Sequence, residues 1–283
     1  MARFFIAGTN LLGSPTAIIR GRDAEHIQVL RLRPGEDVTI CDTEGTDYKC
    51  RLVRADKEEA EFEVIEAVPC KGEPSVEATV LCGLPKGDRV DYIIQKSVEA
   101  GVHDIVFFQS ARCVAKPDDP YKKLERWNRI SEEAAKQSGR GIIPKVSWAS
   151  DYGEVLNTAV HKDLALFMYE TGEREPLNQV LEANKEITSV SVITGPEGGF
   201  DAYEADLARI AGLHICSMGE RILRCETAPV VALTAIMYAT GTFPDPGGRK
   251  WAQSFMHSRR METSASLLFQ HRILRNRPGR FTV

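Results

Sequence analysis

Short apolar runs alternate with helical patterns over most of the chain, and few folds are compatible with that order. Apolar segments that fit buried strands recur near residues 78–83, 104–109, 163–168, 189–194 and 213–217. Between these segments apolar residues recur at helical spacing. Strands that alternate with helices form a mostly parallel sheet covered by helices. We therefore expect an α/β domain over residues 78–241.

Residues 1–70 have a different pattern, in which apolar and polar residues alternate at the period of a strand. The alternation is clear in segments 38–40, 48–52 and 60–64. Before them, a short helical pattern places Ile27 and Leu30 inward, with Val29 as a further candidate. We expect a small β domain here, joined to the α/β domain by a linker at residues 71–77.

The composition is that of an ordinary protein of two domains. Of 283 residues, 43% are hydrophobic and 27% are charged. The most apolar segment, residues 229–238, is too short to span a bilayer, and the start of the chain does not resemble a signal peptide. Seven scattered cysteines without a CxxC pair favour reduced thiols over a zinc site or disulfides. We expect a cytoplasmic protein with no membrane segment and no metal.

The charge is distributed unevenly. The chain carries a net charge of −4, but residues 242–283 hold eight basic and two acidic side chains, so the remainder carries −10. An acidic body binds RNA only through local basic surfaces. Residues 244–248 read PDPGG and break the chain, so we expect the basic C-terminal extension 242–283 to be loosely ordered, with an RNA-binding arm as the alternative.

Two glycine-bearing stretches follow the last two apolar runs. Residues 193–200 read ITGPEGGF and residues 218–228 read MGERILRCETA. Loops at the carboxyl ends of parallel strands are where open α/β sheets bind ligands. Neither stretch has the spacing of a phosphate-binding loop, which makes binding of a nucleoside triphosphate an unlikely function. A tight turn and a small-molecule site remain as alternatives.

The two stretches, in this order and about twenty residues apart, resemble the knotted SPOUT methyltransferases. The resemblance is closest to the RsmE family, which methylates N3 of a uridine in 16S ribosomal RNA. LPKGDR at residues 84–89 and QKSVEAGV at residues 95–102 match the same family. The HIQVLR segment at residues 26–31 resembles its N-terminal PUA-like RNA-binding β-barrel. The resemblance covers roughly residues 1–241.

This resemblance implies a trefoil-knotted α/β domain, a homodimer and S-adenosylmethionine (SAM) as methyl donor. The residues that it places at the cofactor are Thr194, Gly195, Pro196, Glu197, Gly198, Met218, Gly219, Ile222, Leu223 and Ala228, with Tyr169 as a weaker candidate for a third wall.

Methylation of uridine N3 requires loss of the imide proton, and negative charge then spreads onto the flanking carbonyl oxygens. A cation at that position lowers the barrier. Arg224 is the first candidate, followed by Arg221 and Arg112. Glu197 or Glu226 is a candidate proton acceptor, and the alternative is that each only bonds loop amides. The family usually has Ser-Glu-Arg at residues 110–112, whereas this chain has alanine in the middle position.

The predicted partner is 16S rRNA within an assembled small ribosomal subunit. The candidate RNA-binding residues are His26, Arg31, Lys86, Arg126, Arg129 and Arg140. One alternative is another SPOUT enzyme that methylates a different base or the ribose 2′-oxygen, although ribose methyltransferases carry Ser-Leu-Asn where this chain has Cys-Glu-Thr at residues 225–227. The other alternative is a non-catalytic RNA-binding factor for ribosome assembly.

Overall fold

The structure is a computed structural model that describes residues 2–6, 11, 13–117 and 119–242. Residues 1–242 form one compact unit. The expected division at residues 71–77 therefore stays a prediction. The predicted C-terminal extension lies, apart from its first residue, outside the described residues.

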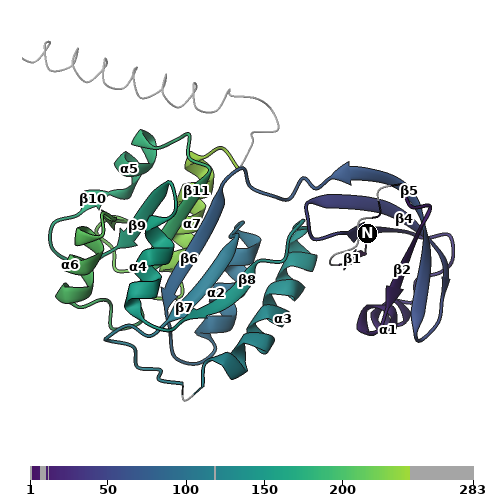
Figure 1. Cartoon of the computed structure of the whole chain (residues 1–283), viewed down its shortest axis with the longest axis horizontal. Coiled ribbons are helices and arrows are strands. Elements are labelled where there is room, and N and C mark those ends of the chain that lie inside the picture. The colour runs from purple at the N-terminus through teal and green to yellow at the C-terminus, as the bar shows by residue number, and fades with distance from the viewer. Residues whose placement is uncertain (1, 7–10, 12, 118, 243–283) are drawn as a thin grey trace, which may run out of the picture. The chain divides into compact units, whose positions relative to one another are not determined.

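The N-terminal part is a five-stranded sheet with strand order β1-β3-β4-β5-β2 (Figure 1). Its elements are β1 (Arg3–Phe5), β2 (Thr16–Arg20), α1 (Arg22–Val29), β3 (Asp37–Cys41), β4 (Thr46–Ala55) and β5 (Glu59–Pro69). The pairs are antiparallel except β1 with β3. Alternate residues of the strands, such as Ile40 and Phe62, pack with Ile27 of α1 in one buried cluster.

The expected inward face of the first helix is only partly correct. Ile27 is fully buried, but Leu30 is 44% exposed and Val29 is 76% exposed. The helix has only eight residues and ends at Val29, with Leu30 at its C-cap. The periodicity of so short a segment does not determine which side chains pack inward.

The second part is a seven-stranded sheet with strand order β10-β12-β9-β11-β6-β7-β8, and every pair in it is parallel. The strands are β6 (Glu77–Gly83), β7 (Asp104–Phe108), β8 (Lys145–Ala149), β9 (Leu164–Met168), β10 (Glu175–Pro176), β11 (Ser189–Thr194) and β12 (His214–Ser217). The five strands expected from the sequence are present. Two edge strands, β8 and β10, were not expected.

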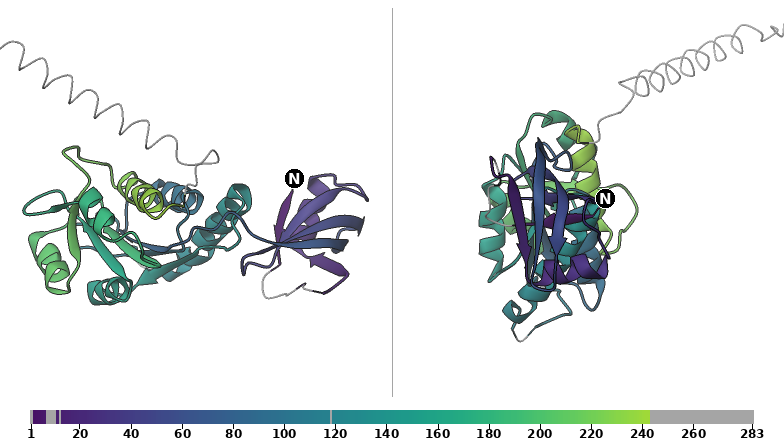
Figure 2. Two further views of the ribbon diagram at one scale, coloured as in Figure 1. Left: turned by 90° about the horizontal axis from the view of Figure 1, so that it is seen from above. Right: turned by 90° about the vertical axis from the view of Figure 1, so that its right-hand side faces the viewer.

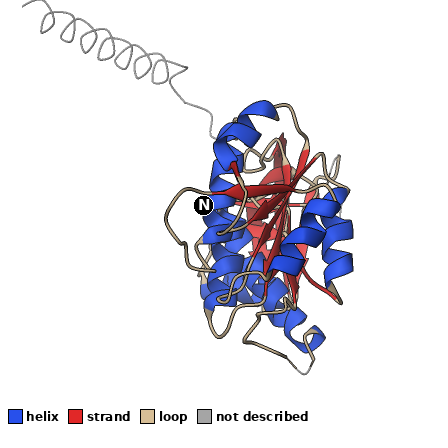
Figure 3. Ribbon diagram, turned by 90° about the vertical axis from the view of Figure 1, so that its left-hand side faces the viewer, coloured by secondary structure: helices blue, strands red, loops and turns tan. Residues whose placement is uncertain are grey.

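Helices cover both faces of this sheet, as Figure 3 shows. They are α2 (Arg89–Glu99), α3 (Tyr121–Ser138), α4 (Tyr152–Val160), α5 (Leu177–Ala183), α6 (Ala202–Ile210) and α7 (Ala228–Ala239). Buried residues of α2, α3, α5 and α7 share one core cluster with one set of strand side chains. Buried residues of α4 and α6 share the other. The α/β prediction is therefore confirmed.

Two local signals in the sequence determine helix starts near the glycine-bearing loops. Asp201 and Glu204 form a capping box at the start of α6, in which each side chain accepts a hydrogen bond from the backbone amide of the other residue. Pro229 lies in the first turn of α7, where proline loses no hydrogen bond. Helix α7 packs against α2, β6 and β11 in the middle of the sheet, and Figure 2 shows it beside α2.

All seven cysteines are free thiols, as expected. Within the described part of the chain, none of the helices has the length and apolar character that a membrane span requires.

Candidate active site

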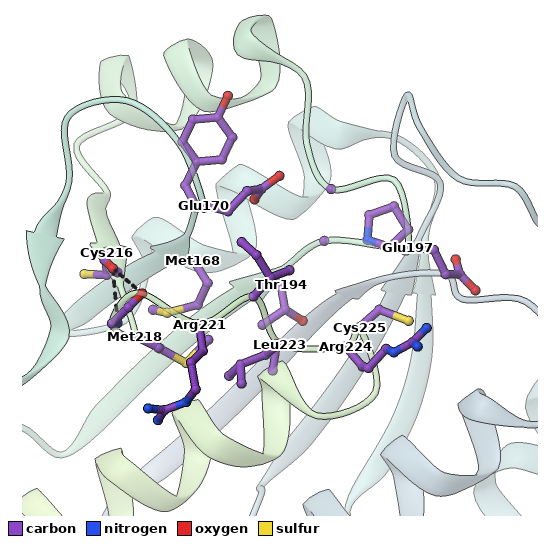
Figure 4. Close-up of a pocket in the computed structure, with 18 of the residues that line it drawn as sticks. Met168, Glu170, Thr194, Glu197, Cys216, Met218, Arg221, Leu223, Arg224 and Cys225 are labelled. Carbon is purple, nitrogen blue, oxygen red and sulfur yellow. Dashed lines mark hydrogen bonds between the residues drawn. The ribbon is translucent and has the colours of Figure 1, made fainter.

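A pocket of about 430 Å³ lies at the carboxyl ends of β9, β11 and β12. Three loops line it, from residues 168–174, 194–199 and 216–228 (Figure 4). Its volume is in the range of small-molecule sites. The predicted cofactor residues that line it are Thr194, Gly195, Pro196, Glu197, Met218, Gly219, Ile222, Leu223, Ala228 and Tyr169. The structure thus brings them together around one cavity, and cofactor binding by them stays a prediction.

Gly198 is the exception, because it faces away from the pocket. A Cβ atom at Gly198 would lie 2.9 Å from both the Cβ atom and the carbonyl oxygen of Arg112. Gly199 lines the pocket instead, with a φ of 65°, and a Cβ atom there would collide with the Glu170 carboxylate. The expectation that Gly198 lines the site is wrong, because this glycine permits close packing on its outer side.

Thr194 is a fully buried residue whose hydroxyl faces an unusual environment. It ends β11 and lines the pocket. Its Oγ1 atom has no nitrogen or oxygen partner among the described residues, and the Cys82 thiol is its polar neighbour. A buried hydroxyl without a strong partner costs free energy. A role of Thr194 in cofactor binding stays a prediction.

The three predicted catalytic arginines are divided between two places. Arg221 and Arg224 are exposed and line the pocket, and Figure 4 shows Arg224 on the side of Cys225 and Glu197, with Arg221 nearer Met218. Neither guanidinium forms an ion pair or hydrogen bond with another residue that the structure describes. Arg112 does not line the pocket, and its Nη1 atom donates to the Gly198 carbonyl oxygen at 3.3 Å.

The two candidate proton acceptors are held by donors. Oε1 of Glu197 accepts hydrogen bonds from the Lys86 backbone amide and from Nη1 of Arg89, each at 2.7 Å. Nε of Arg89 also lies 3.5 Å from Oε2 of Glu226. A bond from its own backbone amide holds the pKa of Glu226 below its ordinary value. These contacts favour the loop-bonding role over the role of a base, because both carboxylates already bond groups of the surrounding loops.

Cys225 lies between Arg224 and Glu226 in the sequence and lines the pocket with them. Burial raises the pKa of its thiol to about 12, so the thiol stays protonated at neutral pH. It donates to Oε2 of Glu226 at 3.2 Å. Cys225 therefore acts here as a hydrogen-bond donor and not as a nucleophile.

Several lining residues were not assigned from the sequence: Arg89, Arg174, Gly199, Cys216, Ser217, Glu220 and Cys225. The sequence indicated Arg89 only as the last residue of the LPKGDR motif and predicted no role for it. Its position as the first residue of α2, next to a loop after a central strand, was the signal that could have marked it.

Most of the predicted RNA-binding residues lie on the surface. His26, Arg31, Lys86, Arg126 and Arg129 are exposed. Arg126 is partly engaged, since its guanidinium forms a bidentate ion pair with an aspartate of α2.

The prediction that Arg140 binds RNA is wrong. Arg140 is only 2% exposed. Its Nε and Nη2 atoms donate to the two carboxylate oxygens of Glu73 at 2.9 and 2.8 Å, and Nη1 donates to the Val98 carbonyl oxygen at 2.9 Å. Its position after a basic helix suggested a surface cation, but the chain turns at Gly139, in the left-handed conformation, and directs the side chain inward.

Comparison with known proteins identifies the family of the chain. An RNA methyltransferase domain model matches residues 72–237, and an RNA methyltransferase PUA domain model matches residues 19–65. The ribosomal RNA small subunit methyltransferase E of Bacillus subtilis is 35% identical over 249 residues, which cover 85% of this chain and 97% of the relative. The chain belongs to the ribosomal RNA small subunit methyltransferase E family. The RsmE resemblance is thus confirmed, and the N-terminal β domain is a PUA domain.

Solved structures agree with this membership. The family member from Neisseria gonorrhoeae, bound to S-adenosyl methionine, has a TM-score of 0.75 and 32% identity, with 84% of this chain and 97% of that chain covered. A methyltransferase of Legionella pneumophila in complex with bound SAM has a TM-score of 0.74 and 26% identity, with the same coverage. As a member of the family, the chain is an RNA methyltransferase.

Proposed function

We propose that this chain binds SAM in the pocket and methylates N3 of a uridine in 16S rRNA, presented by the assembled small ribosomal subunit. The observation that carries the proposal is the pocket itself, formed by three loops at the carboxyl ends of β9, β11 and β12. Two solved relatives with the same fold are bound to SAM.

The residues present fit this cofactor. The orphaned Thr194 hydroxyl and the exposed backbone of the glycine-bearing loop offer bonds to a polar heterocycle. Glu170 and Glu220 line the pocket and form no ion pair with another described residue, so they complement the positive charges of SAM. When bound, SAM supplies an electrophilic methyl group.

The chain's own residues prepare the nucleophile. As N3 loses its proton, negative charge grows on the neighbouring carbonyl oxygens of the base. The guanidinium of Arg224 stabilises that charge and lowers the pKa of N3, with Arg221 as the second cation. Glu197 and Glu226 bond Arg89 and hold the loops, and the N3 proton passes to water. Arg112 supports the glycine-bearing loop from its outer side.

RNA recognition rests on local basic surface. N3 lies on the pairing edge of uridine, so the target base must be unpaired or flipped out. Exposed cations that can contact its phosphates are Arg31, Lys86, Arg126 and Arg129, with His26 on the PUA domain.

We extend the proposal to a trefoil knot, a homodimer and a cytoplasmic location. In support of the knot, the chain leaves β12 near one edge of the sheet and returns to the middle, where α7 packs against α2, β6 and β11. In support of the dimer, α7 exposes Tyr238 by 76% and Val231 by 40%. Ribosomal RNA as substrate implies the cytoplasm.

The test is methylation with labelled SAM of small subunits that lack the modification, beside naked 16S rRNA, with the product identified by mass spectrometry. We expect N3-methyluridine on subunits only. A ribose-methylated product would instead favour the alternative function, methylation of the ribose 2′-oxygen. SAM binding without a product would refute the proposed RNA target. An absence of SAM binding would refute the proposed enzymatic activity.

Arg224→Ala is expected to lower kcat by about 100-fold, the typical effect of removing one donor to a developing oxyanion. Its affinity for SAM should be unchanged. Arg209→Ala, at an exposed arginine of α6 remote from the pocket, is the matched control and should keep the parent rate. An Arg224→Ala enzyme with the parent kcat would contradict the assigned role.

A further inference from the structure

Arg89 connects three segments that are far apart in the sequence. Its Nη1 atom donates to Oε1 of Glu197 at 2.7 Å and to the Lys86 carbonyl oxygen at 3.2 Å. Its Nε atom lies 3.5 Å from Oε2 of Glu226. Glu197 belongs to the loop after β11, and Glu226 precedes α7. One guanidinium therefore joins the start of α2 to both glycine-bearing loops.

The same oxygen of Glu197 also accepts the Lys86 backbone amide at 2.7 Å. Lys86 and Arg89 thus hold this carboxylate from two sides. Behind it, Pro196 packs on Gly83, where a Cβ atom would lie 2.6 Å from the proline Cδ atom. The β6–α2 segment is therefore the fixed support on which the glycine-bearing loop rests.

Arg89 differs from the other arginines that line the pocket. Arg174 donates to the Glu170 carbonyl oxygen at 2.6 Å. Arg221 and Arg224 form no ion pair within 4 Å in the part of the chain that the structure describes, although the charge of Arg224 also acts on Glu226. Without Arg89, Glu197 and Glu226 would be two like charges on adjacent loops, and their repulsion would favour separation of the loops.

We propose that Arg89 is a positioning residue that holds loops 194–199 and 216–228 at the spacing required to bind the cofactor. The inference rests on the proposed function, in which this pocket binds SAM. Arg89 acts through Glu197 and Glu226. It leaves Arg221 and Arg224 as the cations free to act on the RNA base.

The first experiment is calorimetry of SAM binding in the absence of RNA, with the parent protein, Arg89→Met and Arg89→Lys. Arg89→Met should bind SAM about tenfold more weakly, which is within the range of couplings between contacting residues. Arg89→Lys should recover part of the affinity, because an ammonium reaches one carboxylate but not both. Arg209→Met, which removes an exposed arginine paired with one aspartate, is the matched control and should match the parent.

Steady-state kinetics separate positioning from catalysis. For Arg89→Met, KM for SAM should rise about tenfold while kcat at saturating SAM stays near the parent value. A fall in kcat with an unchanged KM would overturn the proposal, since Arg89 would then act on the RNA base itself. Parent SAM affinity in Arg89→Met would overturn it as well.

Hydrogen exchange tests, without any ligand, whether Arg89 holds the two loops. In ligand-free Arg89→Met, amides of residues 195–199 and 219–226 should exchange faster than in the parent, while those of β7 should not change. If the parent binds no SAM, the proposed function fails, and this measurement still decides whether Arg89 holds the loops. Equal exchange in both proteins would refute the proposal that Arg89 holds the two loops.

Discussion

Replacing Arg140 by methionine tests whether this residue stabilises the fold or binds RNA. In the parent, the side chain of Arg140 is 3% exposed and that of Glu73 is 22% exposed. The substitution removes two charge-assisted hydrogen bonds to Glu73 and the bond to the Val98 carbonyl oxygen. Breaking a buried ion pair from one side costs about 3–5 kcal/mol. We expect a loss near 3 kcal/mol, because Glu73 retains some solvent and two backbone donors.

The pH dependence of this loss has a definite sign. Burial opposes the charged form of Glu73, but the Arg140 guanidinium and the backbone amides of Gly141 and Ile142 outweigh it and hold the pKa of Glu73 below its ordinary value. A lowered pKa in the folded state contributes stability above the unfolded pKa, and this contribution is lost as the pH falls through the folded pKa. The difference between parent and Arg140→Met should therefore be full at neutral pH and shrink in acid.

The assay is urea denaturation at pH 7 and at several lower pH values, with RNA binding measured under conditions in which both proteins are folded. Arg129→Met, at an exposed arginine of α3, is the control. It should change the free energy of unfolding by less than about 0.5 kcal/mol and should weaken RNA binding. Parent stability combined with weaker RNA binding in Arg140→Met would refute the assignment of Arg140 to the core.

Three further substitutions test the loops and the PUA domain. Gly199→Ala places a methyl group against the Glu170 carboxylate at a positive φ, so it should cost about 1–2 kcal/mol and weaken SAM binding in calorimetry; parent affinity would contradict the pocket geometry. Asp201→Ala removes the cap of α6 and should cost about 1 kcal/mol in thermal unfolding, whereas an unchanged midpoint would show that Glu204 alone suffices. Arg31→Gly removes a side chain from a residue with a φ of 55°, so stability should not fall while RNA affinity does, as binding titrations would show; unaltered RNA affinity would exclude Arg31 from the interface.

The sequence by itself determined the α/β class, the central strands and two of the three loops that line the pocket. Local pattern carries this information, since a buried parallel strand is a short apolar run and a capping box such as Asp201 with Glu204 spans only four residues. The strands β8 and β10 carried too little pattern to be recognised, because they lie at the edges of the sheet and contribute few buried residues, and β10 has only two residues.

Only the tertiary structure decided which charged residues face which partner. Arg140 and Arg129 lie in the same basic stretch, yet one pairs with Glu73 in the core and the other faces solvent. Likewise Arg89 bonds Glu197, a residue 108 positions away in the chain. Such pairings depend on how distant segments pack, and side-chain periodicity carries no information about contacts across that separation. For this reason the sequence located the site, and the fold determined which residues hold it and which remain free to act.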